Sequence, residues 1–377
     1  MQLDMHYYGT YAMARAAGMS IDAARVVATA AQFVDDNATQ ETIKMLDGAR
    51  LDVEATAHHS ADLKNIDLQD QRRIWVPFHF IPGNEGDSYE ERLICRMDSV
   101  IAREMVAHNV SVQDQPYALE LVGITAHVYA DTFSHYGFSG ISSKRNMVAH
   151  DSFMFFDLQA EIEQYIKDKA KGFFRHYRRE NGHIFDFEHA STEPTTWDRL
   201  KEILLSMIAE RFSGALGHAS VATFPDRPYL NWSFEFDHPL RQREARSNPE
   251  TYLQACRAMY DTFSRFLEQA PRHRSDGGRD FDVIEGLVAE ILFTQAPLQG
   301  RVDAWQSAAR SGSLFSAAED IPAYSLAQWR KQRLDLASLQ DSREVVGFDV
   351  YQFYQAASIH RNYVLRELLP AHGLVVQ

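Results

Sequence analysis

The sequence predicts an all-α protein built as a single multi-helical domain with long functional loops. Three observations favour this class: apolar residues recur at helical spacing in several segments, turn-forming residues fill the stretches between them, and the chain contains no internal repeat or low-complexity tract. With 45% hydrophobic and 24% charged residues, the 377-residue chain has an ordinary globular composition. We expect one domain over 1–377, with C-terminal helices of 245–377 packed on a core of about 1–240.

The first half of the chain is expected to hold helices separated by polar stretches. Gly18 is suited to end the first helix, and Ser20 is suited to cap the second. The aromatic run of 72–84 ends in Pro-Gly-Asn and predicts a loop or a short extended piece. Apolar periodicity predicts helices over 4–17, 21–36, 88–108 and 116–134.

The second half combines helices with longer irregular segments. The stretch 231–238 (NWSFEFDH) predicts a strand or an extended lining, and 272–279 is the best linker candidate, although it is no longer than an ordinary loop. Turn-rich sequence predicts irregular loops over 137–144, 183–196 and 214–228. Apolar periodicity predicts helices over 155–180, 197–212, 249–269, 281–311 and 345–369.

Charge and targeting signals restrict the classes of partner. The formal net charge of −14 repels phosphate backbones, so binding to polymeric nucleic acid is disfavoured. It leaves a small phosphate substrate possible, because bound divalent cations reverse the local field. We expect no signal peptide, no transmembrane segment, two free thiols at Cys95 and Cys256, and a cytoplasmic location.

The most informative motif is ALELVGITAHVYADTFSHYGF, over 118–138. His127, Asp131 and His135 lie four residues apart in an otherwise apolar helix, so they share one face, and Glu120 lies on the same stripe. Buried imidazoles and carboxylates are costly unless they are paired, and a divalent cation would satisfy all three together. The alternative interpretation is a His–Asp–His hydrogen-bond network that stabilises a core.

Further candidate ligands stand near helix ends or in loops. Asp35 lies at the C-terminal end of a predicted helix, where the helix dipole disfavours a carboxylate. Taken singly, each candidate also has a structural explanation as a solvated helix end, a packed core residue or a loop residue. These candidates are Asp4, His6, Asp35, His79, His218 and Asp226.

In chain order, several of these residues resemble the ligand series of the zinc-dependent phospholipase C and trinuclear zinc nuclease superfamily. In that superfamily an Asp ends an early helix, a His precedes a Phe-Ile pair, and a helical H-x3-D supplies a His and a bridging Asp. The matching residues are His6, Ala31-Gln32-Phe33-Val34-Asp35, His79-Phe80-Ile81, His127-x3-Asp131 and His135, within about the first 140 positions. The stretches AAQFVDDN and HVYADTFSHYGFSG also resemble an uncharacterised bacterial family proposed to belong there.

This resemblance implies an all-helical, phospholipase C-like fold that holds two or three zinc ions and hydrolyses a small-molecule or lipid-like phosphoester. Asp131 would bridge metals and Asp35 would act as the base that orients the attacking water. One ion would take Asp35, His79, His127 and Asp131, a second would share Asp131 with His6, and a third would take His135, with His218 and Asp226 as substitutes for the family's remaining ligands.

The chain also departs from that pattern. The family's mature chain begins with a tryptophan whose free amine and carbonyl bind zinc, whereas Asp4 is the candidate replacement here. No clear helical H-x3-D/E motif completes the third site, since His150 is followed four residues later by Met154.

Two alternatives to the hydrolase therefore stay open. One is an HD-type or di-iron enzyme using His79, Asp131 and the pair His150-Asp151, with iron or another divalent metal. The other is a degenerate, non-catalytic protein that binds a metal or a partner.

Overall fold

A computed structural model describes residues 1–58, 67–149, 151–169, 216–238 and 242–376. The protein is mostly helical, which confirms the predicted class in its coarser form, and two small antiparallel sheets accompany the helices. Among the elements that lie wholly within the described residues, the helices of seven or more residues are α1 (Thr10–Ala16), α2 (Ile21–Asp36), α3 (Leu68–Phe78), α5 (Val100–Ser111), α6 (Ala118–His135), α9 (Asn248–Gln269), α10 (Phe281–Leu292), α11 (Leu298–Arg310), α12 (Leu326–Ala337) and α13 (Asp349–Tyr363). The strands are β1 (Glu41–Lys44), β2 (Arg50–Val53), β3 (Met154–Phe156), β4 (Asn231–Phe236) and β5 (Gln242–Ser247). β1 pairs with β2, and the second sheet has the order β3-β4-β5.

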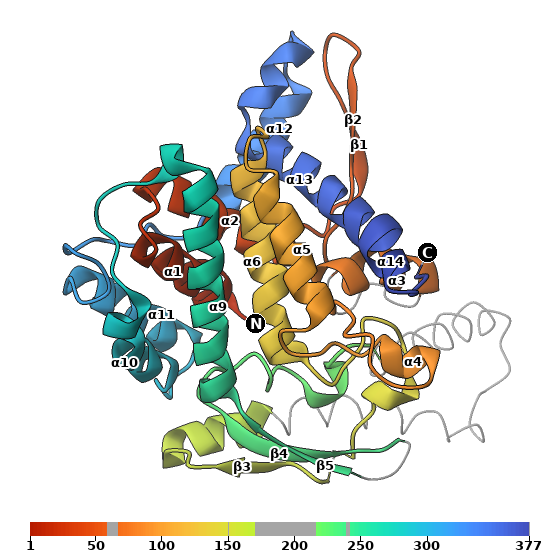
Figure 1. Ribbon diagram of the computed structural model, residues 1–377, viewed down its shortest axis with the longest axis vertical. Helices are drawn as coiled ribbons and strands as arrows, with labels where there is room; N and C mark the ends of the chain where they lie inside the picture. Colours follow the sequence, from red (N-terminus) through yellow and green to blue (C-terminus); the bar gives the residue numbers. More distant parts are fainter. Residues whose placement is uncertain (59–66, 150, 170–215, 239–241, 377) are drawn as a thin grey trace, which may run out of the picture.

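Helix α6 is the central element of the fold. It packs against α2, α5, α9 and α13, and Figure 1 shows it running through the middle of the molecule with the N-terminus beside it. Every residue of α6 except Leu119 is buried, which explains why its sequence is apolar on all sides. The polar residues that the helix does carry are therefore placed inside the protein, where each needs a partner.

Gly123 allows α6 to approach α2 closely. A Cβ atom at this position would lie 2.7 Å from the Cβ of Ala30 and would also collide with the carbonyl oxygen of Val27. The absence of a side chain therefore brings the two helix backbones together. One turn further along α6, this approach places the ring of His127 against the backbone of Ala31.

The prediction of a loop over 72–84 is wrong for its first part, because α3 continues to Phe78. Asp67 caps this helix, and Pro77 lies in its last turn. Proline has no N–H to donate to the carbonyl of Arg73, but the guanidinium of Arg361 in α13 donates to that carbonyl instead, at 2.9 Å. A distant residue thus compensates for the helix-breaking proline.

Other predicted helices are confirmed with changed boundaries or interruptions. The segment over 4–17 begins with a π-helical turn, Asp4–Gly9, before α1, and the helices over 21–36, 116–134 and 249–269 correspond to α2, α6 and α9. The segment 88–108 divides into α4 (Tyr89–Arg92) and α5, and 281–311 divides at Pro297 into α10 and α11. The last segment, 345–369, contains α13 followed by a π-helical turn, Val364–Leu368.

The predictions for the middle of the chain are correct only in part. The expected strand over 231–238 is confirmed as β4, whereas the helix expected from 155 begins instead as β3, since Phe155 pairs with Trp232. Residues 160–169 are helical, and the rest of that helix, the loop over 183–196 and the helix over 197–212 lie outside the described residues. The hairpin β1–β2, strand β5 and helix α12 were not predicted.

Most helices share one hydrophobic core, and a smaller cluster lies against the β3-β4-β5 sheet and includes Phe80. Cys95 and Cys256 are buried free thiols, as expected. Within the described part of the chain, no helix is long and apolar enough to cross a membrane.

Candidate metal centre

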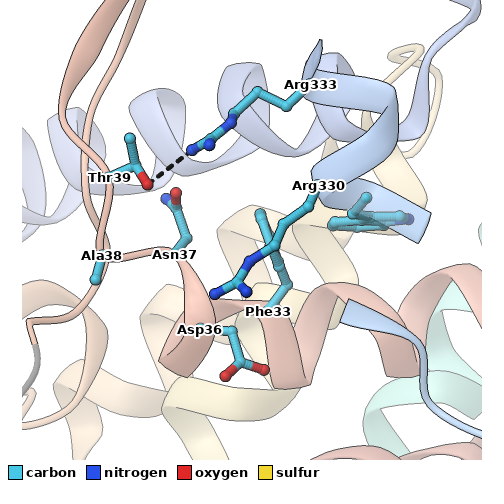
Figure 2. A pocket seen from close by; sticks show the side chains of 8 residues that line it. Phe33, Asp36, Asn37, Ala38, Thr39, Arg330 and Arg333 are labelled. Carbon is cyan, nitrogen blue, oxygen red and sulfur yellow. Dashed lines mark hydrogen bonds between the residues drawn. The ribbon is translucent and has the colours of Figure 1, made fainter. Parts of the chain in front are cut away.

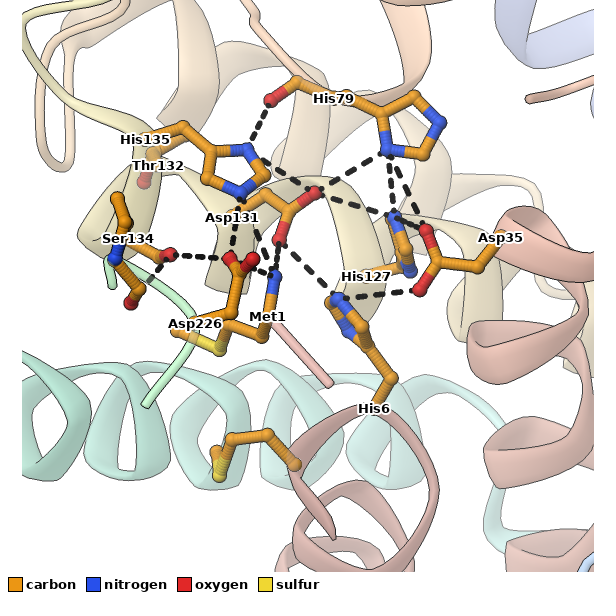
Figure 3. A network of polar contacts seen from close by, with 12 residues as sticks. Met1, His6, Asp35, His79, His127, Asp131, Thr132, Ser134, His135 and Asp226 are labelled. Atoms are coloured by element: carbon orange, nitrogen blue, oxygen red, sulfur yellow. Dashed lines mark hydrogen bonds and ion pairs between the residues drawn. The ribbon is translucent and has the colours of Figure 1, made fainter. Parts of the chain in front are cut away.

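Three groups of histidine and aspartate side chains meet between the N-terminus, α2, α3 and α6. In each group, one potential ligand atom per residue lies within 4.8 Å of the others. Figure 3 shows most of these side chains pointing toward one another from separate elements. The groups are His6–His127–Asp131, Asp35–His79–His127 and His135–His218–Asp226.

The elements that carry these residues explain why they converge. His127, Asp131 and His135 occupy successive turns of α6, on one face. Asp35 lies at the C-terminal end of α2, and His79 is the residue that ends α3. The turn-rich segment after 215 contributes His218 and Asp226, and the first π-helical turn contributes His6.

Four of the histidines donate one ring N–H to a backbone carbonyl. A carbonyl can only accept, so this contact fixes the tautomer and leaves a lone pair on the other ring nitrogen when the imidazole is neutral. The four contacts are His127 Nδ1 to Ala31 O at 2.8 Å, and His79 Nε2 to Thr56 O, His135 Nδ1 to His79 O and His218 Nδ1 to Ala222 O at 2.9 Å each. Such outer contacts orient imidazoles that bind metal ions.

The opposite nitrogens point inward, toward one another and toward carboxylates. His79 Nδ1 and His127 Nε2 are 3.3 Å apart, and they lie 3.5 and 3.3 Å from Oδ2 of Asp131. His135 Nε2 lies 3.3 Å from Oδ1 of Asp226. Lone pairs facing lone pairs repel, so this arrangement requires protons or a cation between them.

His6 and Asp131 contain buried polar atoms that have no hydrogen-bond partner among the described residues. Both ring nitrogens of His6 and Oδ2 of Asp131 are of this kind, although His6 Nε2 is 3.2 Å from Oδ1 of Asp131. Burial, together with the neighbouring His127 and the α-amino group, lowers the pKa of His6 to about 4, so its imidazole is neutral. Neutral imidazole, carboxylate and orphaned buried atoms form a donor set that fits a divalent metal ion.

The carboxylates of the centre are held ionised. Burial alone would raise the pKa of Asp131, but His135, the α-ammonium group and His127 hold it well below its usual value. Burial also opposes ionisation of Asp226, and the α-ammonium group and His218 hold the pKa of that carboxyl far below its usual value. Asp35 differs in that 33% of its side chain is exposed, so the centre is most accessible on its side.

The α-amino group of Met1 is a member of the centre that sequence reasoning missed. It donates to Oδ1 of Asp131 at 2.9 Å, and it lies 3.2 Å from Oδ1 of Asp226 and 3.5 Å from Nε2 of His135. Burial lowers its pKa, but the aspartates outweigh this effect and raise the pKa to about 11. The signal was present in the family resemblance, in which a terminal amine is a ligand.

Asp4, expected to replace that terminal ligand, is placed elsewhere. Its carboxylate lies 3.1 Å from Nε of Arg301, outside the three groups. Residues two apart in a helical turn point to nearly opposite sides, so Asp4 and His6 cannot both face the centre. Glu120 is also outside the groups, at the start of α6.

The protein-family comparison gives one match, over residues 1–368, to a family described as a family of unknown function (DUF6765). The chain belongs to this family. No curated protein and no solved structure matches the chain. Met1 and all the residues of the three groups lie inside the matched part, so the family model covers the whole centre.

The alternative HD-type set is not assembled among the residues that can be described. His79 and Asp131 belong to the three groups, but Asp151 is exposed and in none of them. His150 lies outside the described residues.

A small pocket adjoins the C-terminal end of α2, the helix that carries Asp35. It has a volume of about 90 Å³, and Figure 2 shows Arg330 of α12 reaching into it above Asp36. Arg333 donates to the hydroxyl of Thr39 on the same wall. Helix α12 therefore contributes cationic side chains beside Asp36, the residue that follows Asp35 in the chain.

Proposed function

We propose that the protein is a metal-dependent hydrolase that acts on phosphoesters with two or three zinc ions. The observation that carries this proposal is the orientation of the histidines. Four of them direct an N–H outward to a carbonyl and, when the imidazole is neutral, a lone pair inward, toward aspartates and the other inward-facing nitrogens. A hydrogen-bond network would need N–H donors on the inner side, whereas divalent cations need the lone pairs found there.

The proposed ligand sets follow the three groups. Asp35, His79, His127 and one oxygen of Asp131 would hold the first ion, and the other oxygen of Asp131 would join His6 at a second. His135, His218 and Asp226 would hold the third. When bound, such ions lower the pKa of water and neutralise charge on phosphoryl oxygens.

Asp131 and Asp35 have different proposed roles. Asp131 is fully buried, and its two oxygens face different groups, which suits a bridging ligand. Asp35 is the accessible carboxylate, so it is suited to orient the attacking water and to accept its proton. The same ligand order supports our proposal that the fold is related to the zinc phospholipase C superfamily.

The proposed substrate is a small or lipid-like phosphoester. The net charge of −14 disfavours a polymeric nucleic acid, while bound cations would attract one phosphate group locally.

Metal content measured by plasma mass spectrometry tests the proposal directly. Protein without a tag, stripped with a chelator and reloaded, should hold two or three zinc ions and hydrolyse p-nitrophenyl phosphate or bis(p-nitrophenyl) phosphate. H127Q and D131N should lose most of the zinc and the activity. H372Q is the matched control, because His372 lies near the C-terminus and pairs with Glu104.

Other results would replace the proposal. Full zinc occupancy in D131N would remove Asp131 from the centre. A visible absorption band and bound iron would favour the di-iron alternative. One tightly held ion, without hydrolysis of either ester, would favour a non-catalytic role.

A further inference from the structure

A second polar cluster lies next to the third ligand group. Arg227 follows Asp226 in the chain, Arg301 extends from α11, and Tyr229 neighbours both, with the guanidinium of Arg301 over its ring, 5.7 Å from the ring centre. All three are nearly inaccessible, with 5%, 1% and 2% of their surfaces exposed. Two buried arginines so close to the centre need an explanation.

Several donors in this cluster have no hydrogen-bond partner among the residues that the structure describes. They are Nε of Arg227, Nη1 of Arg301 and the hydroxyl of Tyr229. The hydrogen bonds with good geometry account for other atoms: Arg227 Nη2 donates to Thr223, and Arg301 Nη2 donates to Gln2. The guanidinium of Arg227 also interacts with the hydroxyl groups of Tyr165 and Tyr229. Buried donors without acceptors are rare and costly, so they mark a place for an acceptor.

The cluster also carries excess positive charge. Among the described residues, Asp4 is the one carboxylate within ion-pair distance of Arg301, 3.1 Å from its Nε, and no carboxylate lies within that distance of Arg227. Arg227 lies over the ring of Tyr165, 5.3 Å from its centre. Burial raises the pKa of Tyr165, yet Arg227 and nearby Lys169 bring it below its usual value.

We propose that Arg227, Arg301 and Tyr229 bind a tetrahedral oxyanion. The next step rests on the proposed function. Since this site follows Asp226 in the chain, it would hold a second anionic group of the phosphoester substrate. The substrate class is therefore a phosphoester that carries another phosphate-like group near the scissile bond. Guanidinium groups bind both carboxylates and phosphates, but donors on three separate side chains exceed the two oxygens of a carboxylate, whereas a tetrahedral oxyanion has enough oxygens for all of them.

Binding of inorganic phosphate to the chelator-treated full chain tests this proposal without requiring zinc or catalysis. Calorimetric titration at constant ionic strength should show phosphate binding, and acetate should bind more weakly. R227Q and Y229F should each weaken phosphate binding about tenfold. R310Q is the matched control, since Arg310 lies on the same helix as Arg301 but is exposed, and this variant should bind like the parent.

Y229F separates a binding role from a purely structural one. The proton of its hydroxyl has no acceptor among the described residues, so removing this buried group should leave the unfolding midpoint unchanged or raise it in the absence of phosphate. The same variant should show a smaller phosphate-induced rise in that midpoint. Equal phosphate affinity in the parent, R227Q and Y229F would overturn the proposal, as would no phosphate binding to the parent.

Zinc content distinguishes this failure from failure of the proposed function. A protein that binds zinc and hydrolyses phosphoesters, but does not bind phosphate when stripped of metal, would refute the oxyanion site alone. A protein that binds phosphate through Arg227 but never binds zinc would support the oxyanion site and refute the hydrolase.

Discussion

Replacement of Glu120 by glutamine should stabilise the protein in a pH-dependent way. Glu120 is buried at the start of α6, and burial, with repulsion from Asp349, raises its pKa from 4.5 to about 8. Between these two pH values the unfolded chain has lost the proton and the folded protein keeps it. The folded state then binds more protons than the unfolded state, so the stability of the parent falls as pH rises.

The size of the effect follows from the same shift. Each pKa unit corresponds to about 1.4 kcal/mol, so the advantage of E120Q should grow from near zero at pH 4.5 to at most about 5 kcal/mol above pH 8. Urea denaturation of parent and variant at pH 5, 6, 7 and 8 measures this difference, and other titrating groups cancel in it. Zinc content should not change, since Glu120 lies outside the three ligand groups. A stability difference that stays constant from pH 5 to pH 8 would refute the reasoning.

Two further perturbations test the geometry of the centre. G123A places a methyl group 2.7 Å from the Cβ of Ala30, so it should lower the free energy of unfolding by about 1–3 kcal/mol and reduce zinc content. Urea denaturation and mass spectrometry check this, and unchanged values would mean that the close approach of α2 and α6 is dispensable. Adding Gly-Ser before Met1 moves the ammonium group away from Asp131 and Asp226 and so removes its competition with a cation, and a competition titration should show tighter binding of the ion nearest His135. Identical zinc affinities with and without the extension would exclude the amine from the centre.

The parts of the fold that could be predicted depend on local sequence. Helices α2, α6 and α9 combine apolar periodicity with clear ends, and these signals lie within the helices themselves. Helix α3 could not be predicted, because Pro77 is tolerated only through Arg361, which lies 288 residues from Arg73. The sequence pattern of residues 68–78 alone contains no information about a contact with so distant a residue.

The residues of the candidate site also differ in how far local sequence could predict them. His127, Asp131 and His135 could be grouped from the sequence, since helix geometry alone puts them on one face. The convergence of Asp35, His79 and Asp226 on that face required the family resemblance, and their metal-binding roles stay predictions. The oxyanion cluster had no sequence signal, because Arg227 and Arg301 are far apart in the chain and their unpaired donors are a property of packing.

The α-ammonium group of Met1 affects the two sides of the centre differently. It lies within hydrogen-bonding distance of Oδ1 of Asp131 and within ion-pair distance of Asp226, so positive charge is already present beside the third group. Oδ2 of Asp131 has no hydrogen-bond partner among the described residues, and the inward lone pairs of His79 and His127 face it. A cation at the His79 side would meet these nitrogens without an ammonium group beside them, whereas one at the Asp226 side would have to displace the amine or deprotonate it. If the proposed ions bind, we therefore expect the one between Asp35, His79 and His127 to be bound most tightly.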